Sequence, residues 1–106
     1  MPNSIPSVSF LDNKDFFCHD LPTLFLPQIG KILVTGASGY IGGRLVPELL
    51  ARGYKVRAMV RRASPEYSEL WPDAEIAVAD AREIETLRIA LKDIDTAYYL
   101  IHSLLL

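Results

Sequence analysis

Short apolar runs and stretches of helical periodicity alternate along the chain from residue 31 onward. Residues 31–35 form a β-branched apolar run, which is typical of a strand buried on both faces. After a glycine-rich segment, Ile41, Leu45 and Leu49 recur every four positions and predict the apolar face of a helix. Residues 55–60 then alternate polar and apolar side chains, which predicts a second strand.

The second half of the chain continues this alternation. Residues 66–70 predict a single helical turn, and Glu75–Val78 predicts a third strand. Residues 80–83 have the acceptor-x-x-glutamate spacing of a capping box, which indicates the start of another helix. That helix is expected to bury four apolar side chains on one face: Ile84, Leu87, Ala90 and Leu91. Residues 96–101 predict a fourth strand.

Strands that alternate with helices predict β-α-β units and a parallel sheet. Right-handed crossovers give the strand order 3-2-1-4, so we expect an α/β fold with a partial doubly wound parallel sheet of the Rossmann type. Pro47 lies inside the first helix, where it removes a hydrogen bond and crowds the carbonyl of Gly43. We expect a kink there and not a helix end, because the apolar period continues through Leu49 and Leu50.

The first thirty residues differ from the rest of the chain. They contain four of the seven prolines and all four phenylalanines, and one lysine stands against three aspartates. No helical or strand periodicity is present in this stretch. We expect residues 1–30 to form an irregular extension; a targeting or docking arm is the alternative.

Composition excludes several classes of protein. The chain is 50% hydrophobic and 23% charged, which is typical of a globular domain, and a net charge of −2 argues against a nucleic-acid partner. A single cysteine, Cys18, excludes an internal disulfide framework and a cysteine-rich metal site. The apolar stretches are too short for a membrane helix, and we find no secretory signal. We therefore expect a cytoplasmic protein with no membrane association.

Three glycines with the spacing G-x-x-G-x-x-G follow the first strand and open the first helix. This context is the one that a dinucleotide-binding motif requires. Gly36 would allow the tight turn, Gly39 would let a pyrophosphate approach the backbone, and Gly42 would let the helix pack closely on the strand. A purely structural strand-turn-helix connection is the alternative.

Residues beside the glycines add donors for an anion. The N–H groups at the helix start, around Tyr40 and Ile41, would supply donors and partial positive charge. The hydroxyl of Ser38 would supply another donor. A Walker-type phosphate loop is excluded, because no glycine-lysine-serine or glycine-lysine-threonine sequence follows.

The end of the second strand indicates which dinucleotide binds. NAD-specific folds usually place an acidic residue about 20 residues after the glycines. This chain has Arg61 and Arg62 there, with Lys55 and Arg57 on the same strand and no acid between residues 54 and 65. Guanidinium groups bind a 2′-phosphate that a carboxylate would repel, so NADP(H) is favoured over NAD(H). The alternative is that these arginines form only a solvated basic edge, and this alternative fits Arg62 better than Arg61.

Four segments match a known pattern. They are Val-Thr-Gly-Ala-Ser-Gly-Tyr-Ile-Gly-Gly-Arg-Leu-Val-Pro at 34–47, Met-Val-Arg at 59–61, Val-Ala-Asp at 78–80 and Tyr-Tyr-Leu-Ile-His-Ser at 98–103. With them, the chain resembles the N-terminal part of an atypical or extended short-chain dehydrogenase/reductase, of the NAD(P)H-binding, NmrA-like group. We accordingly expect residues 31–106 to be the N-terminal part of a truncated NAD(P)-binding Rossmann domain.

The resemblance implies positions for the rest of the cofactor. Asp80 and Ala81 would lie beside the adenine. Three residues at the end of the predicted fourth strand would lie along the cofactor near its nicotinamide half: Leu100, Ile101 and His102. The family usually has glycine at the position of Ala79 and leucine at that of Ala81, and it does not account for residues 1–30.

Catalytic members of the family use a tyrosine with a lysine four residues later. None of the five tyrosines of this chain has a lysine at that position. His102 is a candidate acid/base, but a histidine at a strand end is more often structural or in contact with the cofactor. We therefore expect no catalytic residue within the chain.

Two functions from different classes remain open. The chain is either the cofactor-binding half of an NADP-dependent oxidoreductase or epimerase, or a non-catalytic module that senses NADP(H) for a partner. A fourth strand at the end of the sheet would leave an uncharged edge uncovered. We expect the missing C-terminal half of a longer protein, or a partner chain, to complete the sheet.

Overall fold

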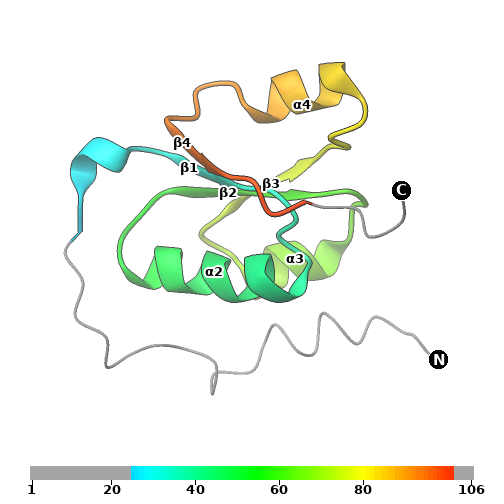
Figure 1. The fold of residues 1–106 in the computed structure, drawn as a ribbon. Helices are drawn as coiled ribbons and strands as arrows, with labels where there is room; N and C mark the ends of the chain where they lie inside the picture. Colours follow the sequence, from blue (N-terminus) through cyan, green and yellow to red (C-terminus); the bar gives the residue numbers. More distant parts are fainter. Residues whose placement is uncertain (1–24, 102–106) are drawn as a thin grey trace.

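Four parallel strands form the centre of the molecule (Figure 1). The computed structural model describes residues 25–101 of the chain. The strands lie in the order β3-β2-β1-β4, which confirms the predicted fold class and strand order. Their bounds are Ile32–Val34 for β1, Val56–Val60 for β2, Glu75–Val78 for β3 and Thr96–Tyr98 for β4.

Helices cover both faces of the sheet and give the molecule three layers. α2 (Tyr40–Ala51) and α3 (Pro65–Leu70) lie against one face, and α4 (Ile84–Ala90) lies against the other (Figure 1). A short 3₁₀ helix, η2 (Pro27–Ile29), precedes β1. Each connection between consecutive strands therefore contains a helix, as parallel pairing requires. Within residues 25–101, no helix has the length and apolar character needed to cross a membrane.

β1 is the buried centre of the sheet. Ile32, Leu33 and Val34 each expose 1% of their surface or less. Leu33 packs with Met59 and Ala90 on the face that α4 covers, whereas Ile32 and Val34 pack on the opposite face. The alternation of side chains along a strand explains this division, and it confirms the prediction of a strand buried on both faces.

The first helix continues through its internal proline. α2 runs from Tyr40 to Ala51 and contains Pro47, so the helix does not end there, as predicted. It stops before Gly53, which has a φ of +93° and donates its N–H to the carbonyl of Leu50 at 3.1 Å. Glycine adopts this left-handed conformation without the strain that a side chain would bring.

β4 ends at Tyr98 and not at residue 101, so the predicted fourth strand was too long. The cause is Thr35, directly after β1. Its N–H and its hydroxyl both donate to the carbonyl of Tyr98, at 3.0 and 2.9 Å. Its Oγ1 accepts from the N–H of Leu100 at 2.8 Å. A side chain thus takes the place of the next backbone partner, and the chain leaves the sheet.

The start of α4 also differs from the prediction. The N-cap is Glu83, which makes no side-chain capping bond, so the predicted capping box at residues 80–83 is wrong. Asp80 instead accepts from the N–H of Arg82 at 2.9 Å. Aspartate readily forms such a bond to the backbone two residues later, and this local turn delays the helix.

Only part of the predicted apolar face of α4 contacts the sheet. Ala90 is buried and Leu87 packs against the same cluster. Ile84 and Leu91 expose 65% and 41% of their surface. These two residues are the first residue and the C-cap of a short helix, so only the face that contains Leu87 and Ala90 reaches the core.

Residues 25–30 lie against the amino end of the sheet. The rings of Phe25 and Tyr54 pack with their centroids 4.8 Å apart, and the Tyr54 hydroxyl accepts from the N–H of Leu26 at 2.9 Å. The hydroxyl of Thr96 donates to the carbonyl of Ile29 at 2.8 Å. The first 24 residues of the expected extension lie outside the described residues, and its boundary at residue 30 stays a prediction.

Candidate functional site

The loop between β1 and α2 is the centre of the site. Gly36 has a φ of +64°, a left-handed conformation that permits the sharp turn after β1. The N–H of Ala37 donates to the carbonyl of Met59 at 3.2 Å and joins the loop to β2. The N–H of Gly39 donates back to the carbonyl of Gly36 at 3.0 Å. The loop is therefore closed on itself and fixed at the carboxyl edge of the sheet.

Gly42 allows α2 to pack closely on the loop, whereas Gly39 leaves open space beside it. A Cβ atom at Gly42 would lie 2.9 Å from the carbonyl carbon of Gly36 and 3.0 Å from the Cα of Ala37. Both are backbone atoms, so a side chain there would push α2 away from the loop. Gly39 has an ordinary φ of −82°, and a Cβ there would meet only the Gly36 oxygen, at 3.3 Å. The space beside Gly39 is otherwise open.

The N-terminus of α2 points into this region. Its N-cap is Gly39, and among residues 25–101 no side chain caps the first turn. The first N–H groups of a helix lack partners within the helix and carry partial positive charge. The side chains of Tyr40 and Ile41 are exposed here, and the Arg44 guanidinium lies 4.7 Å from the centre of the Tyr40 ring. This end of α2 is electrostatically suited to an anion.

A cavity of about 80 Å³ opens beside the loop at the carboxyl edge. Four separate parts of the chain line it: the loop, the end of β2, the residue after β3 and the segment after β4. The lining residues are Gly36, Ser38, Met59, Val60, Arg61, Ala79 and Ile101. The fold thus brings together four residues that the sequence predicted for the site: Gly36, Ser38, Arg61 and Ile101.

Arg61 and Arg62 follow β2 directly, and both are exposed. The carbonyl of Val60 accepts from the N–H of Ala79 at 2.9 Å. Val60 pairs with Val78, so Arg61 follows β2 directly and Asp80 comes one residue later than the position opposite Arg61. Arg61 makes no hydrogen bond and no ion pair with any other residue in the described range 25–101.

The other two cations of the same strand do not reach the site. Arg57 donates through Nη1 to the carbonyls of Ala90 and Lys92, each at 2.7 Å, at the end of α4. Its Nε pairs with Glu75 at 2.7 Å. Lys55 precedes β2 and lies at the amino edge of the sheet. Side-chain alternation directs Arg57 to the α4 face, away from the cavity.

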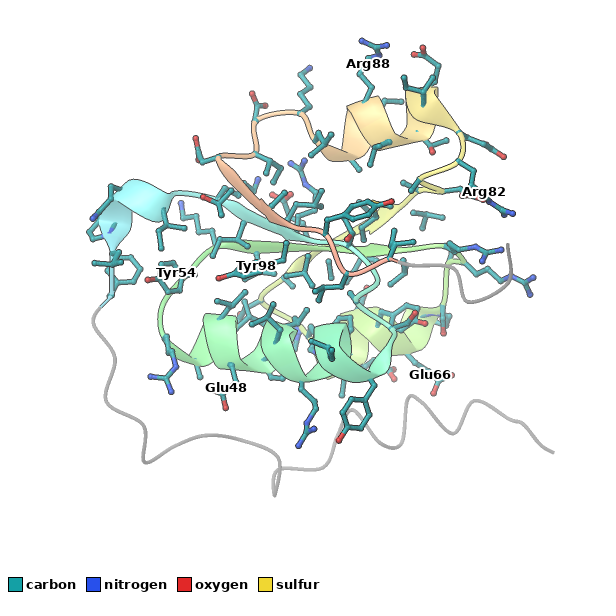
Figure 2. All side chains as sticks on the ribbon, in the orientation of Figure 1. Glu48, Tyr54, Glu66, Arg82, Arg88 and Tyr98 are labelled. Carbon is teal, nitrogen blue, oxygen red and sulfur yellow. The ribbon has the colours of Figure 1, made fainter. Side chains whose placement is uncertain are left out.

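Asp80 is held by Arg82. Its Oδ1 accepts from the backbone N–H of Arg82 at 2.9 Å and from Nε at 3.1 Å, and its Oδ2 accepts from Nη2 at 2.8 Å. These bonds hold the pKa of Asp80 well below its ordinary value, and the charge of Arg61 acts in the same direction. The carboxylate is therefore ionised at neutral pH. The Arg82 side chain is 75% exposed, and Figure 2 shows it beyond the end of β3.

The other predicted residues lie along the same edge where the structure describes them. Ala81 is half-buried against the cluster beneath α4. A Cβ at Gly36 would lie 3.4 Å from the carbonyl oxygen of Leu100 and 3.6 Å from Cγ1 of Ile101, so the segment after β4 runs beside the loop. His102 lies outside the described residues.

Three residues shape the edge although the sequence analysis gave them no role: Thr35, Met59 and Arg82. Thr35 connects β4 to the loop, and Met59 accepts the bond from Ala37. Arg82 lies two residues after Asp80, the position whose backbone N–H an aspartate side chain commonly binds in a turn. The spacing of these two residues could therefore have indicated their contact. The contacts of Thr35 and Met59 depend on distant residues and have no such signal.

A larger cavity of about 370 Å³ lies on the α4 side of the sheet, and no residue predicted for the site lines it. Its walls are Arg57, Ile76, Ala77, Val78, Thr86, Ile89 and Ala90. Cavity size therefore does not identify the site; the convergence of separate segments at the carboxyl edge does.

Comparisons with known proteins agree with this geometry. A family model described as the NmrA-like family matches residues 28–104. Over 67 residues the chain is 43% identical to sterol demethylase protein B of Methylococcus capsulatus, a match that covers 63% of this chain and 20% of that protein. Over 78 residues it is 38% identical to a 3-beta-hydroxysteroid dehydrogenase of Mycolicibacterium neoaurum, covering 74% of this chain and 20% of the enzyme.

A plant protein is also similar. The chain is 32% identical over 77 residues to the chloroplastic divinyl chlorophyllide a 8-vinyl-reductase of Cucumis sativus, with 65% of this chain and 18% of that protein covered. The chain thus spans about a fifth of the length of these relatives.

Proposed function

This chain belongs to the NmrA-like family, and we propose that it binds a nicotinamide dinucleotide as the cofactor-binding part of an oxidoreductase-like protein. The cavity at the carboxyl edge carries the proposal, because the glycine loop and the ends of three strands meet there. In open α/β sheets, ligands bind in the crevice at this edge. Relatives named as a dehydrogenase and a reductase support the same class of function.

The pyrophosphate of the cofactor would lie over Gly39, at the start of α2. The open space beside Gly39 lets a phosphate approach the backbone, and the uncapped helix end supplies N–H donors and partial positive charge. The hydroxyl of Ser38 makes no hydrogen bond within residues 25–101 and would donate to a phosphate oxygen. Tyr40 and Ile41 would contribute their backbone N–H groups.

The two halves of the cofactor would extend in opposite directions from this point. Asp80 and Ala81, after β3, would lie beside the adenine. Leu100, Ile101 and His102, after β4, would lie along the nicotinamide half. The sheet order supports this division, because β3 and β4 lie on opposite sides of β1.

We further propose a preference for NADP(H) over NAD(H). Arg61 lines the cavity and has donors that no described residue uses, and Arg62 adjoins it. A guanidinium forms strong charge-assisted hydrogen bonds to a phosphate. Since Lys55 and Arg57 lie elsewhere, the preference depends on the two arginines after β2.

The reaction of the whole protein is open between two classes. An NADP-dependent oxidoreductase or epimerase fits the relatives' names. A non-catalytic NADP(H)-sensing module of the NmrA-like type is the second class, and the family match fits it equally. A tyrosine-lysine pair of this spacing in a longer reading frame would support the enzyme.

The free edge of β4 belongs to the same proposal. In the described part of the chain, β4 pairs only with β1, and Tyr98 and Tyr99 expose 39% and 64% of their surface. An uncovered strand edge tends to pair with another strand. A further strand, from a longer chain or from a partner, would complete the sheet here.

Dinucleotide binding is tested by titrating the 106-residue chain and its Gly39→Ala variant with NADPH and NADH in a calorimeter. We expect the variant to lose at least tenfold in affinity for both, because a methyl group would hold the pyrophosphate away from the backbone. The fold should survive, since Gly39 has an ordinary φ and a Cβ there has one close neighbour.

Glu69→Ala, on the exposed surface of α3, is the matched control and should bind both dinucleotides as the unmodified chain does. Circular dichroism of all three proteins verifies that they are folded. Unchanged affinity in folded Gly39→Ala, or no binding by the unmodified chain, would refute the proposal.

A further inference from the structure

One carboxylate lies close to two arginines at the carboxyl edge. Arg61 and Asp80 follow neighbouring strands, whose ends are joined by the hydrogen bond from Ala79 to Val60, and the charge of Arg61 acts on the Asp80 carboxyl. Arg82 nevertheless takes both oxygens of Asp80 through three bonds of 2.8 to 3.1 Å. Arg61 makes no such bond within the described residues.

The local turn explains which arginine binds the carboxylate. One of the three bonds uses the backbone N–H of Arg82, so the turn already holds the two residues together. Only the Arg82 side chain then has to be ordered, and it meets both carboxylate oxygens from one side. The donors of Arg61 stay available at the cavity.

We infer that Arg82 determines the preference of the site for a 2′-phosphate by holding Asp80 away from Arg61. The inference rests on the proposed dinucleotide site. If Arg82 were removed, the Asp80 carboxylate would pair with Arg61. It would then compete with the 2′-phosphate for the N–H donors of Arg61 and would also repel the phosphate directly.

The local charge balance supports the same role. Three cations stand at this edge, Arg61, Arg62 and Arg82, against two acids, Asp80 and the exposed Glu83. Loss of Arg82 would leave two cations against two acids, so the edge would lose its positive excess. A ligand group that carries close to two negative charges would be affected most.

The test compares 2′,5′-ADP with 5′-AMP, which differ only in the 2′-phosphate, on the 106-residue chain and on Arg82→Ala. We expect affinity for 2′,5′-ADP to fall about fivefold, the size of one newly formed exposed ion pair. Affinity for 5′-AMP should stay unchanged. Adding Asp80→Asn to Arg82→Ala should restore the ratio of the affinities for 2′,5′-ADP and 5′-AMP, because an amide has no charge with which to hold Arg61. The ratio is the readout because both nucleotides carry the adenine beside which Asp80 would lie.

Arg88→Ala is the matched control, since Arg88 is an exposed arginine on α4 and its loss changes the net charge equally (Figure 2). Equal losses for both nucleotides in Arg82→Ala would overturn the inference, because they would show a contact with the shared adenosine. A double variant that does not recover the ratio of the two affinities would also overturn it. Either result leaves the proposed function intact if the unmodified chain binds NADPH; a chain that binds no dinucleotide refutes the proposed function itself.

Discussion

Arg61→Glu places a carboxylate at the cavity edge where we propose that a guanidinium holds the 2′-phosphate. A hydrogen bond to a charged group contributes about 1.5–3 kcal/mol. Repulsion between the new carboxylate and one phosphate charge adds about 1 kcal/mol at a separation of about 4 Å in water. Because Arg61 is exposed, solvent and salt weaken both effects. Affinity for NADPH should still fall at least tenfold, which corresponds to about 1.4 kcal/mol.

Calorimetric titration of the folded variant with both dinucleotides measures this change. NADH has only hydroxyl groups at the ribose and should bind as well as before or better. Added salt should weaken NADPH binding to the unmodified chain more than NADH binding, since only the former uses this charge pair. The control is Arg88→Glu, the same charge reversal on the exposed surface of α4, which should leave the ratio of the two affinities unchanged (Figure 2).

An equal loss of affinity for NADPH and NADH would contradict a contact between Arg61 and the 2′-phosphate. Arg61 would then shape the end of β2 without contacting the 2′-phosphate, and the preference between the two cofactors would be undecided.

Four further predictions concern stability. Gly42→Ala should lower the free energy of unfolding by about 1–3 kcal/mol, because its Cβ meets the backbone of Gly36; an unchanged melting temperature in calorimetry would contradict this. Arg57→Met should cost about 2 kcal/mol in urea unfolding, since two carbonyls at the end of α4 lose a charged donor, and a loss below 0.5 kcal/mol would contradict it. Trp71→Phe should lower the free energy of unfolding by less than about 1.5 kcal/mol, because the buried Nε1 of Trp71 has no partner within residues 25–101. Trp71→Ala should lower it by about 3–5 kcal/mol, because it leaves a cavity in the core. Equal losses for the two variants in urea unfolding would contradict this. The pKa of Asp80 is lowered in the folded protein, so the stability that the ionised carboxylate contributes is complete above its ordinary pKa of 3.8 and is lost as the pH falls below that value. Asp80→Asn should therefore reduce the fall of the free energy of unfolding at acid pH. An unchanged dependence of stability on pH would contradict this.

The alternation of strands and helices could be predicted because it depends on local patterns. The apolar run of β1 and the four-residue apolar repeat of α2 are properties of neighbouring residues, and each appears in the structure with small shifts at its ends. The strand order followed from the handedness of the crossovers, which is a general rule of parallel sheets. The glycine spacing placed the loop and therefore the centre of the site.

The errors occur where a residue's partner is distant in sequence or where two local signals compete. β4 was predicted too long because the Thr35 hydroxyl, more than sixty residues away, takes over its hydrogen bonds. The capping box predicted at Asp80 does not form, because the Asp80 carboxylate accepts the N–H of Arg82 in a local turn and the helix begins later. The sequence analysis could not place the Arg57 side chain, because its partners at the end of α4 come together only in the folded chain.

The α/β class, the order of the strands, the position of the glycine loop and the two arginines after β2 could all be read from the amino-acid sequence. Which side chains share the carboxyl edge depends on how the folded chain brings distant segments together. In the folded chain, Arg61 and Asp80 follow neighbouring strands, Asp80 pairs with Arg82, and Arg57 bonds to the end of α4. Periodicity and turn chemistry act over a few residues and can be recognised locally, whereas pairing between charged groups depends on distances that exist only after the strands are in register.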